Sequence, residues 1–256
     1  MFNGNVINKT YLYDGTFEGL LSIVFDCYVE KVIPLHITPE SMVTFNFLEE
    51  FEIKRTNIEK SQRIFNGIVK NISYDTLYHS YYAFLSNEKE KEIHILNYLL
   101  NGFVIGPKIN TMLSLDFVFA VHQMHKKVLG ESHRFKGLLR FIEIGHPLLY
   151  ASIHPEHNIL ENLGQHFMRR LPTQNFIIHD KNRNLAFIYN TKGYQIVDSS
   201  SLTIPSLSEE EKNYQTLWTT FFETIAIKER TNPRLQMQYM PKKYWQDLTE
   251  LNHSPT

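Results

Sequence analysis

The segment NFIIHDKNRNLAFIYNTKGYQIVD, residues 175–198, decides the fold class because it contains three short strand-like runs in succession. The runs NFIIH, LAFIY and YQIVD are rich in the aromatic and β-branched residues that strands favour. The connections DKNRN and TKG supply the Asp, Asn and Gly residues typical of hairpin turns. We therefore predict two consecutive β-hairpins.

Two more strands and a helix are expected just before this segment. RFKGLLRFIEI (134–144) and LLYASIHP (148–155) flank Gly145-His146-Pro147 and are predicted to pair as strands around a tight turn. ILENLGQHFMRR (159–170) returns to helical spacing. Together with the hairpins, this gives a sheet of about five strands.

The two ends of the chain differ from this sheet. Near the N-terminus, TYLY is followed by the turn and helix cap Asp14-Gly15-Thr16, which predicts a strand, a turn and a helix. Residues 58–128 have helical spacing with breaks near Ser73, Asn87 and Gly106-Pro107. Residues 31–57 are mixed, because Pro34 and Pro39 limit regular structure, and FEIKRT (51–56) could form a short edge strand. After a linker at Leu202–Leu207, Ser208 and Glu211 form a capping box that begins a long amphipathic helix ending at Lys228 and Arg230.

The fold class predicted from these patterns is α+β. Residues 1–130 form a mainly helical part with an N-terminal strand, and residues 131–256 form a mostly antiparallel sheet that the long C-terminal helix closes. We expect the two parts to form one compact unit. Neither a GxGxxG nor a GxxxxGK[ST] motif is present, so the common nucleotide-binding folds are not supported.

Composition excludes several classes of protein. The 256 residues are 43% hydrophobic and 21% charged, and no apolar run approaches the ~20 residues that cross a bilayer. The N-terminus MFNGNVINKT lacks the features of a signal peptide, so a cytoplasmic location without membrane contact is expected. The single cysteine, Cys27, excludes an intrachain disulfide and a CxxC zinc site, and its helical apolar setting predicts a buried inert thiol.

Charge is distributed unevenly along the chain. Residues 1–125 contain 10 Lys and Arg against 14 Asp and Glu, whereas residues 126–256 contain 16 against 13. A polyanion would therefore bind the second half. If residues 134–141 form a strand, Arg134, Lys136 and Arg140 share one face, on which alternate residues lie about 7 Å apart, a spacing that suits a nucleic-acid backbone. An ordinary solvated sheet face would have the same pattern.

Further cationic and aromatic residues follow this segment. His166, Arg169 and Arg170 end the predicted helix, and Asp180 with Arg183 occupies a hairpin loop where a simple turn salt bridge would also explain them. The C-terminal tail adds two aromatic residues that could either stack on a base or dock onto the core. The complete candidate nucleic-acid-binding set is Arg134, Lys136, Arg140, Arg169, Arg170, Arg183, Arg230, Arg234, Lys242, Lys243, Tyr244 and Trp245.

Twelve histidines raise the question of a metal site. The densest group is His154-Pro155-Glu156-His157 with His166 nine residues later, but it is not HExxH and Pro155 opposes a helical turn there. We expect no metal and no cofactor. No Ser/His/Asp signature is visible, because such triads are recognised from geometry.

Several separated motifs resemble a bacterial family assigned to DNA metabolism or DNA repair, for which no reaction is established. The motifs are YDGTFEGLLSIVFDCY, HRFKGLLRF, HFMRR with IIHDKNRNLAFIY, and IAIKERTNPRLQMQYMPKKYWQDLTE, so the resemblance extends from about Thr10 to Glu250. Members of that family occur beside a radical S-adenosylmethionine protein, and a similar domain is fused behind a uracil-DNA glycosylase domain. The matching motif positions are Asp14, Gly15, Phe17, Glu18, His133, Arg134, Lys136, Gly137, Arg140, Phe141, His166, Phe167, Arg170, Asp180, Arg183, Arg230, Asn232, Pro233, Met240, Pro241, Tyr244 and Trp245.

The resemblance implies a setting of DNA repair or modification. We expect a protein that binds DNA through its basic second half and works with a radical S-adenosylmethionine partner. One alternative is an enzyme acting on nucleic acid with His166 and Asp180 as acid and base. Another is an accessory subunit that contacts its protein partner but not DNA. Because this chain has no glycosylase domain attached, the resemblance to the fused relatives does not imply a base-excising activity.

Overall fold

The computed structural model describes residues 1–43, 50–145, 147–200, 207, 209–227 and 230–251. The chain separates into two compact units, Met1–Leu129 and Gly130–Thr256, and each is described by itself. His146, Ser208, Lys228 and nearly all of the expected linker at 202–207 lie outside the described residues.

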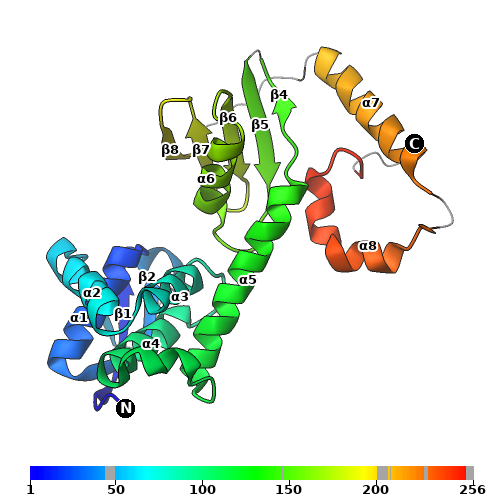
Figure 1. Cartoon of the computed structure of the whole chain (residues 1–256). Helices are drawn as coiled ribbons and strands as arrows, with labels where there is room; N and C mark the ends of the chain where they lie inside the picture. Colours follow the sequence, from blue (N-terminus) through cyan, green and yellow to red (C-terminus); the bar gives the residue numbers. More distant parts are fainter. Residues whose placement is uncertain (44–49, 146, 201–206, 208, 228–229, 252–256) are drawn as a thin grey trace. The chain divides into compact units, whose positions relative to one another are not determined.

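The N-terminal unit contains a three-stranded parallel sheet in the order β2–β1–β3. Tyr11, Leu12 and Tyr13 of β1 are all buried, as expected for the central strand of a sheet covered on both faces. Helices surround this sheet (Figure 1). The elements are β1 (Asn5–Tyr13), α1 (Phe17–Glu30), β2 (Val32–Pro39), η1 (Glu40–Met42), β3 (Phe51–Ile53), α2 (Ile58–Asn71), α3 (Tyr74–Phe84), α4 (Lys91–Ile105), η2 (Gly106–Thr111) and the first part of α5 (Asp116–Leu138).

The cap of α1 was predicted correctly. Thr16 Oγ1 accepts a hydrogen bond from the Gly19 amide at 2.9 Å, and the Asp14 carboxylate accepts from the Thr16 amide and hydroxyl. Cys27 is fully buried, and burial raises the pKa of its thiol to about 12. A thiol in this state is mostly protonated near neutral pH, as the expectation of an inert cysteine requires.

Strands were expected at TYLY and FEIKRT, where β1 and β3 lie, but β2 and the parallel pairing of the three strands were missed. Residues 32–39 form β2 although they contain Pro34 and Pro39, which argued against regular structure. Because β2 lies at the edge of the sheet, a residue without an amide donor is tolerated there. The α+β class is confirmed, but strands occur in both halves of the chain.

The C-terminal unit contains a five-stranded sheet in the order β4–β5–β6–β7–β8. β5 and β6 pair in parallel, and the other neighbouring strands are antiparallel. The crossover helix α6 packs on one face, where a Cβ at Gly164 would clash with the Phe187 ring (Figure 1). The elements are β4 (Ile142–Glu143), β5 (Leu148–Ile153), α6 (Leu160–Arg170), β6 (Asn175–Asp180), β7 (Leu185–Tyr189), β8 (Tyr194–Asp198), α7 (Glu209–Ile225), α8 (Pro233–Tyr239) and η4 (Lys242–Asp247).

The prediction of a strand beginning at Arg134 was wrong. Helix α5 continues to Leu138, and only Ile142 and Glu143 pair as β4. Phe135 and Leu139 are buried, and they satisfy both strand alternation and helical spacing. Buried Val128 lies seven residues before Phe135, so the apolar face of the helix continues without a break.

The prediction that the C-terminal helix closes the sheet is also not supported. Helix α7 exists, but it ends at Ile225 and none of its residues is buried. The Glu211 carboxylate accepts a hydrogen bond from the Glu143 amide of β4 at 3.1 Å. The apolar stripe of α7, which includes Leu217, Phe221 and Ile225, is therefore largely exposed.

No single helix in the described parts of the chain is both long enough and apolar enough to cross a membrane. The segments Lys91–Thr111 and Asp116–Leu138 meet that criterion only as a pair bent by 62°.

Candidate functional site

The three cations expected on one strand face do not share a face. Successive helical residues are rotated by about 100°, so Arg134 and Lys136 of α5 point in nearly opposite directions. Arg140 lies beyond the helix and is paired with a carboxylate: its Nη2 lies 2.6 Å from Glu250 Oε1. Trp218 Nε1 donates to the same carboxylate at 3.0 Å.

The Arg140–Glu250 pair is partly enclosed. The Glu250 side chain is only 3% exposed and that of Arg140 is 27% exposed. Burial alone would raise the pKa of Glu250, but the hydrogen bonds from Arg140 and Trp218 outweigh it and lower the pKa. Arg140 also donates to the Gly137 carbonyl at the end of α5. Arg140 therefore connects the end of α5 to the C-terminal segment. Because its guanidinium is already paired with Glu250, it is not available to a phosphate.

Arg183 and Asp180 form the turn salt bridge that sequence reasoning offered as the simpler explanation. Arg183 Nη1 lies 3.0 Å from Asp180 Oδ2, and the guanidinium also donates to the Pro155 and Glu156 carbonyls. Asp180 Oδ1 accepts from the amides of Asn182 and Arg183. Burial raises the pKa of Asp180, and the nearby guanidinium only partly opposes this.

Lys243 and Tyr244 are likewise used within the protein. Lys243 Nζ lies 2.6 Å from a Glu156 carboxylate oxygen. Tyr244 is buried, packs edge-on against Phe135 at 4.9 Å and donates its hydroxyl hydrogen to buried Glu131 at 2.9 Å. Tyr244 therefore docks the C-terminal segment onto the core and cannot stack on a base.

Trp245 is partly buried, and its indole nitrogen donates to the Met240 carbonyl at 2.8 Å. Lys242 Nζ lies 5.8 Å from the centre of its ring. Arg230, Arg234 and Lys242 are exposed, and no ion pair joins them to other described residues.

Four basic side chains do converge, at the adjoining ends of α5 and α6. We name Lys136, His166, Arg169 and Arg170 the α5–α6 basic cluster. Ser132 of α5 donates to Asn162 of α6 at 2.6 Å, and one helical turn later on each helix come Lys136 and His166. Burial lowers the pKa of His166 first, and the charges of Lys136, Arg169 and Arg170 lower it further.

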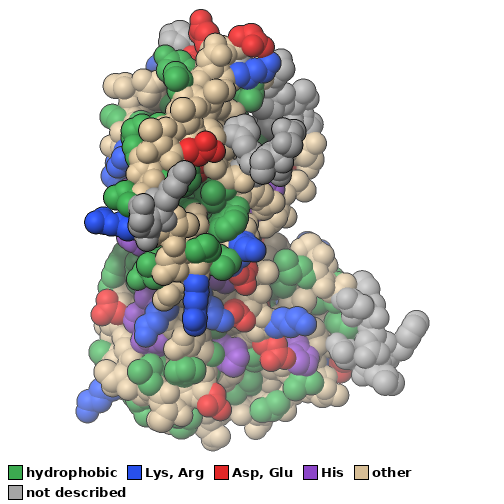
Figure 2. Space-filling view, turned by 90° about the vertical axis from the view of Figure 1, so that its right-hand side faces the viewer, with side chains coloured by type: hydrophobic (Ala, Val, Ile, Leu, Met, Phe, Trp, Pro, Cys, Tyr) green, Lys and Arg blue, Asp and Glu red, His purple; other side chains and the backbone are tan. Residues whose placement is uncertain are grey.

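These cations differ from Arg140, Arg183 and Lys243 in having no carboxylate partner among the described residues. Arg169 and Arg170 are exposed and Lys136 is half-buried. Figure 2 shows one face of the molecule, on which Lys and Arg side chains are interspersed with Asp, Glu, His and hydrophobic side chains.

His166 and Asp180 are not brought together. Because β5 and β6 are parallel, α6 must run back along them, which places its end near the start of β6. Asp180 is the last residue of β6, on the order of 15 Å farther along the strand. An acid–base pair made of these two residues is therefore not supported by their positions.

The opposite face of the sheet carries polar side chains, and of these the sequence pattern singled out His154 alone, as part of the densest histidine group. Tyr150 and Ser152 alternate along β5, and His154 follows at the next alternate position. Asp247 of η4 lies 2.9 Å from His154 Nδ1 and accepts from the Ser152 hydroxyl at 3.2 Å. The Tyr150 hydroxyl lies 3.0 Å from His179 Nδ1. The contacts of Asp247 join the C-terminal segment to the sheet, whereas the contact between Tyr150 and His179 joins β5 to β6.

Three histidines of the N-terminal unit pack together. The ring of His79 lies 4.3 Å from His122 and 4.7 Å from His125, measured between ring centres. The Nε2 atoms of His122 and His125 are buried without a hydrogen-bond partner among the described residues. Burial lowers the pKa of all three, and the neighbouring imidazoles lower it further. Within the described ranges, no three His, Cys, Asp or Glu side chains are arranged to hold a metal ion.

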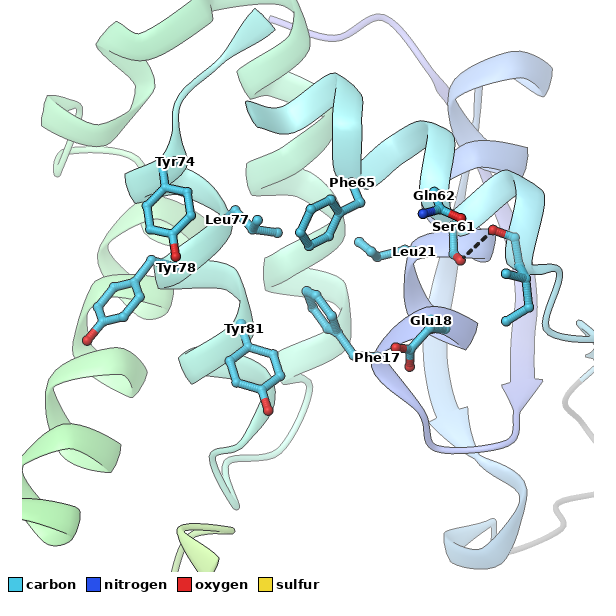
Figure 3. A pocket seen from close by; sticks show the side chains of 11 residues that line it. Phe17, Glu18, Leu21, Ser61, Gln62, Phe65, Tyr74, Leu77, Tyr78 and Tyr81 are labelled. Atoms are coloured by element: carbon cyan, nitrogen blue, oxygen red, sulfur yellow. Dashed lines mark hydrogen bonds between the residues drawn. The ribbon is translucent and has the colours of Figure 1, made fainter. Parts of the chain in front are cut away.

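The N-terminal unit also contains a hollow of about 560 Å³ between α1, α2 and α3 (Figure 3). Aromatic side chains from all three helices surround it. Its lining residues are Phe17, Glu18, Leu21, Ile58, Ser61, Gln62, Phe65, Tyr74, Leu77, Tyr78 and Tyr81. We call it the aromatic hollow. Sequence reasoning did not identify it, although positions 58, 61, 62 and 65 and positions 74, 78 and 81 each follow helical spacing.

The chain matches a known protein family over much of its length. The family described as a domain of unknown function, DUF4130, matches residues 89–250. No curated protein and no solved structure matches the chain. The matched range includes the α5–α6 basic cluster and every named strand of the C-terminal unit, whereas the aromatic hollow precedes it. Since the match covers more than half of the 256 residues, the chain belongs to the DUF4130 family.

Proposed function

We propose that this protein binds nucleic acid in DNA repair or modification, together with a radical S-adenosylmethionine partner, and that the α5–α6 basic cluster contacts the phosphate backbone. The resemblance of the sequence motifs to a DNA-repair family supplies the biological setting. The basic cluster supplies the physical support, because it is where described cations of the C-terminal unit gather without carboxylates.

The position of His166 is the observation that carries the proposal. Three cationic side chains from two helices lie close enough to lower its pKa in addition to the effect of burial. Gathering like charges costs free energy, and a bound phosphate group would offset that cost. The C-terminal ends of helices favour one or two cations through the helix dipole. The helix dipole therefore explains a cation at the end of each helix, but it does not explain why the cations of two helices gather around His166.

The candidate set is therefore smaller than the one predicted from sequence. Arg140, Arg183, Lys243 and Tyr244 act within the protein, and we leave them out of the proposed contact. Arg230, Arg234, Lys242 and Trp245 lie in the C-terminal segment and are kept as secondary candidates.

The test is a binding series with duplex and single-stranded DNA across salt concentrations. Wild-type affinity should fall steeply as salt rises, because binding releases counterions. Replacing Lys136, Arg169 and Arg170 together by Gln should reduce the slope of log affinity against log salt by about 0.9 for each duplex phosphate that the variant no longer neutralises. Arg134→Gln is the matched control, because Arg134 is exposed on the other side of α5.

Affinity that does not depend on salt, or equal slopes for the triple variant and the control, would contradict the proposal. The same series should be run with and without the radical S-adenosylmethionine protein. Co-purification of the two proteins that survives nuclease, without DNA binding by either the pair or the single protein, would favour an accessory role instead.

A further inference from the structure

The aromatic hollow of the N-terminal unit is independent of the proposed DNA contact. Its volume of about 560 Å³ lies within the range of small-molecule sites, and side chains from three helices surround it. Figure 3 shows the rings of Phe17, Phe65, Tyr74, Tyr78 and Tyr81 placed around the hollow. The space is therefore of a size and shape that a compact organic ligand could occupy.

Exposure of the lining supports a binding role. Tyr74 is 67% exposed, Ile58 is 61% exposed and Phe65 is 43% exposed, although all three are large apolar or aromatic side chains. Single exposed apolar residues are common, but these gather around one hollow. A ligand that covered them would remove apolar surface from water.

The charge of the lining decides which class of ligand fits. Glu18 is the one Asp or Glu among the eleven residues lining the hollow, and neither Lys nor Arg is among them. No ion pair or side-chain hydrogen bond joins the Glu18 carboxylate to other described residues. An anionic ligand such as a nucleotide would meet this carboxylate without a compensating cation.

The aromatic rings of the lining also favour a cationic ligand over an anionic one. The face of an aromatic ring carries partial negative charge, which attracts a cation placed over it. Five aromatic side chains and a carboxylate that forms no ion pair with a described residue together make a negative, partly apolar enclosure. Ser61 contributes little polarity, because its hydroxyl already donates to the Ile58 carbonyl at 2.9 Å (Figure 3).

We propose that the aromatic hollow binds a small organic cation with an apolar or aromatic body, of the quaternary or alkylated ammonium class. The charged group lies beside Glu18 and the ring of Phe17, and the apolar or aromatic body extends past Phe65 toward the tyrosine rings (Figure 3).

The test compares three probes that share a benzyl group: benzyltrimethylammonium, benzyl alcohol and benzylphosphonate. Binding to the full-length protein is followed by shifts in the NMR signals of the lining aromatic side chains. The cation should bind about tenfold more tightly than the neutral probe, and the anion should bind most weakly. Equal binding of all three probes, preference for the anion, or no shift with the cation at millimolar concentration would overturn the proposal.

Two variants connect the preference to this site. Glu18→Gln should reduce affinity for the cation about fivefold to tenfold and leave the neutral probe unchanged. Glu59→Gln is the matched control, since Glu59 is also an exposed carboxylate in the first turn of its helix but does not line the hollow. Equal effects of the two substitutions would show that Glu18 acts through the helix dipole and not on the ligand.

A third variant tests the rings. Tyr74→Ser should weaken cation binding severalfold without affecting folding, because Tyr74 is 67% exposed. Unchanged affinity in both Tyr74→Ser and Tyr78→Ser would place the cation elsewhere and overturn the assignment.

Discussion

The C-terminal unit uses its basic side chains in two different ways. Arg140 is joined to a carboxylate that is only 3% exposed, and the pair connects the end of α5 to the end of the chain. In the α5–α6 basic cluster, Lys136, Arg169 and Arg170 gather around His166 without a carboxylate among the described residues. The comparison teaches that a count of cations does not measure a binding surface, because only unpaired charges remain available to a ligand.

The largest expected effect on stability comes from removing Arg140 from its ion pair with Glu250. Arg140→Met should lower the free energy of unfolding of the C-terminal unit by about 2 kcal/mol at pH 7, because it leaves the Glu250 carboxylate buried without its guanidinium. The value is below that for a fully buried pair because Arg140 is 27% exposed. Both tryptophans, Trp218 and Trp245, lie in this unit, so denaturation followed by Trp fluorescence reports on it.

The pH dependence of Arg140→Met provides a second check. In the wild type the pKa of Glu250 is lowered, so the pair contributes stability above the pKa of an unfolded Glu and loses it as the pH falls through the lower folded value. Without Arg140, protonation of Glu250 relieves the buried charge, and the difference between variant and wild type should shrink below about pH 4. A variant that keeps its stability but loses DNA affinity would show that Arg140 belongs with the binding cations after all.

The distance along the sequence between interacting residues explains which features of the candidate site could be predicted. The turn salt bridge of Asp180 and Arg183 joins residues three positions apart, and it was available from sequence as the simpler explanation. Arg140 and Glu250 are 110 positions apart, and Tyr244 reaches Glu131 across 113 positions. Local patterns do not reveal such pairs, so the candidate set contained residues that the fold uses internally.

Elements of the fold that depend on neighbouring residues were likewise predicted, whereas those that depend on distant residues were not. The breaks near Ser73 and Gly106 and the two hairpins after Asn175 depend on neighbouring residues and were predicted. The strand assigned at Arg134 failed because Phe135 and Leu139 fit two periods, and only continuity with Val128 distinguishes them. The aromatic hollow was missed because periodicity identifies an apolar helix face but not whether another element covers it.

An intermediate effect is expected at the three histidines of the N-terminal unit. His79, His122 and His125 have lowered pKa values, first through burial and then through one another, with Lys126 adding to the effect on His122 and His125 and Asp75 opposing it at His79. As the pH falls below about 6.5 the unfolded chain takes up protons first, so stability present above that pH is lost as the pH approaches the lowered folded values.

Replacing His122 and His125 together by Asn should therefore flatten the loss of stability between about pH 7 and pH 5. Far-UV circular dichroism during thermal unfolding would follow it, with exposed His133→Asn as the control. If the double variant and the wild type lose stability in parallel on acidification, the imidazoles are not neutral in the folded protein.

The smallest effect on stability is expected in the α5–α6 basic cluster. A small effect there would most clearly distinguish its cations from Arg140, which is paired with a carboxylate. Lys136→Gln removes a like charge and breaks no ion pair with a described residue, so the free energy of unfolding should change by less than about 0.5 kcal/mol or increase slightly. The same substitution should raise the pKa of His166 toward its ordinary value, because one of the repelling charges is gone.

An NMR titration of His166 measures that pKa directly, and Arg134→Gln on the other side of α5 should leave it unchanged. A substitution that preserves stability, raises the pKa of His166 and weakens DNA binding would separate this cluster from the structural cations. If Lys136→Gln instead costs as much stability as Arg140→Met, Lys136 has a carboxylate partner in solution. The distinction between paired and available charge would then fail at the cluster on which the proposed function depends.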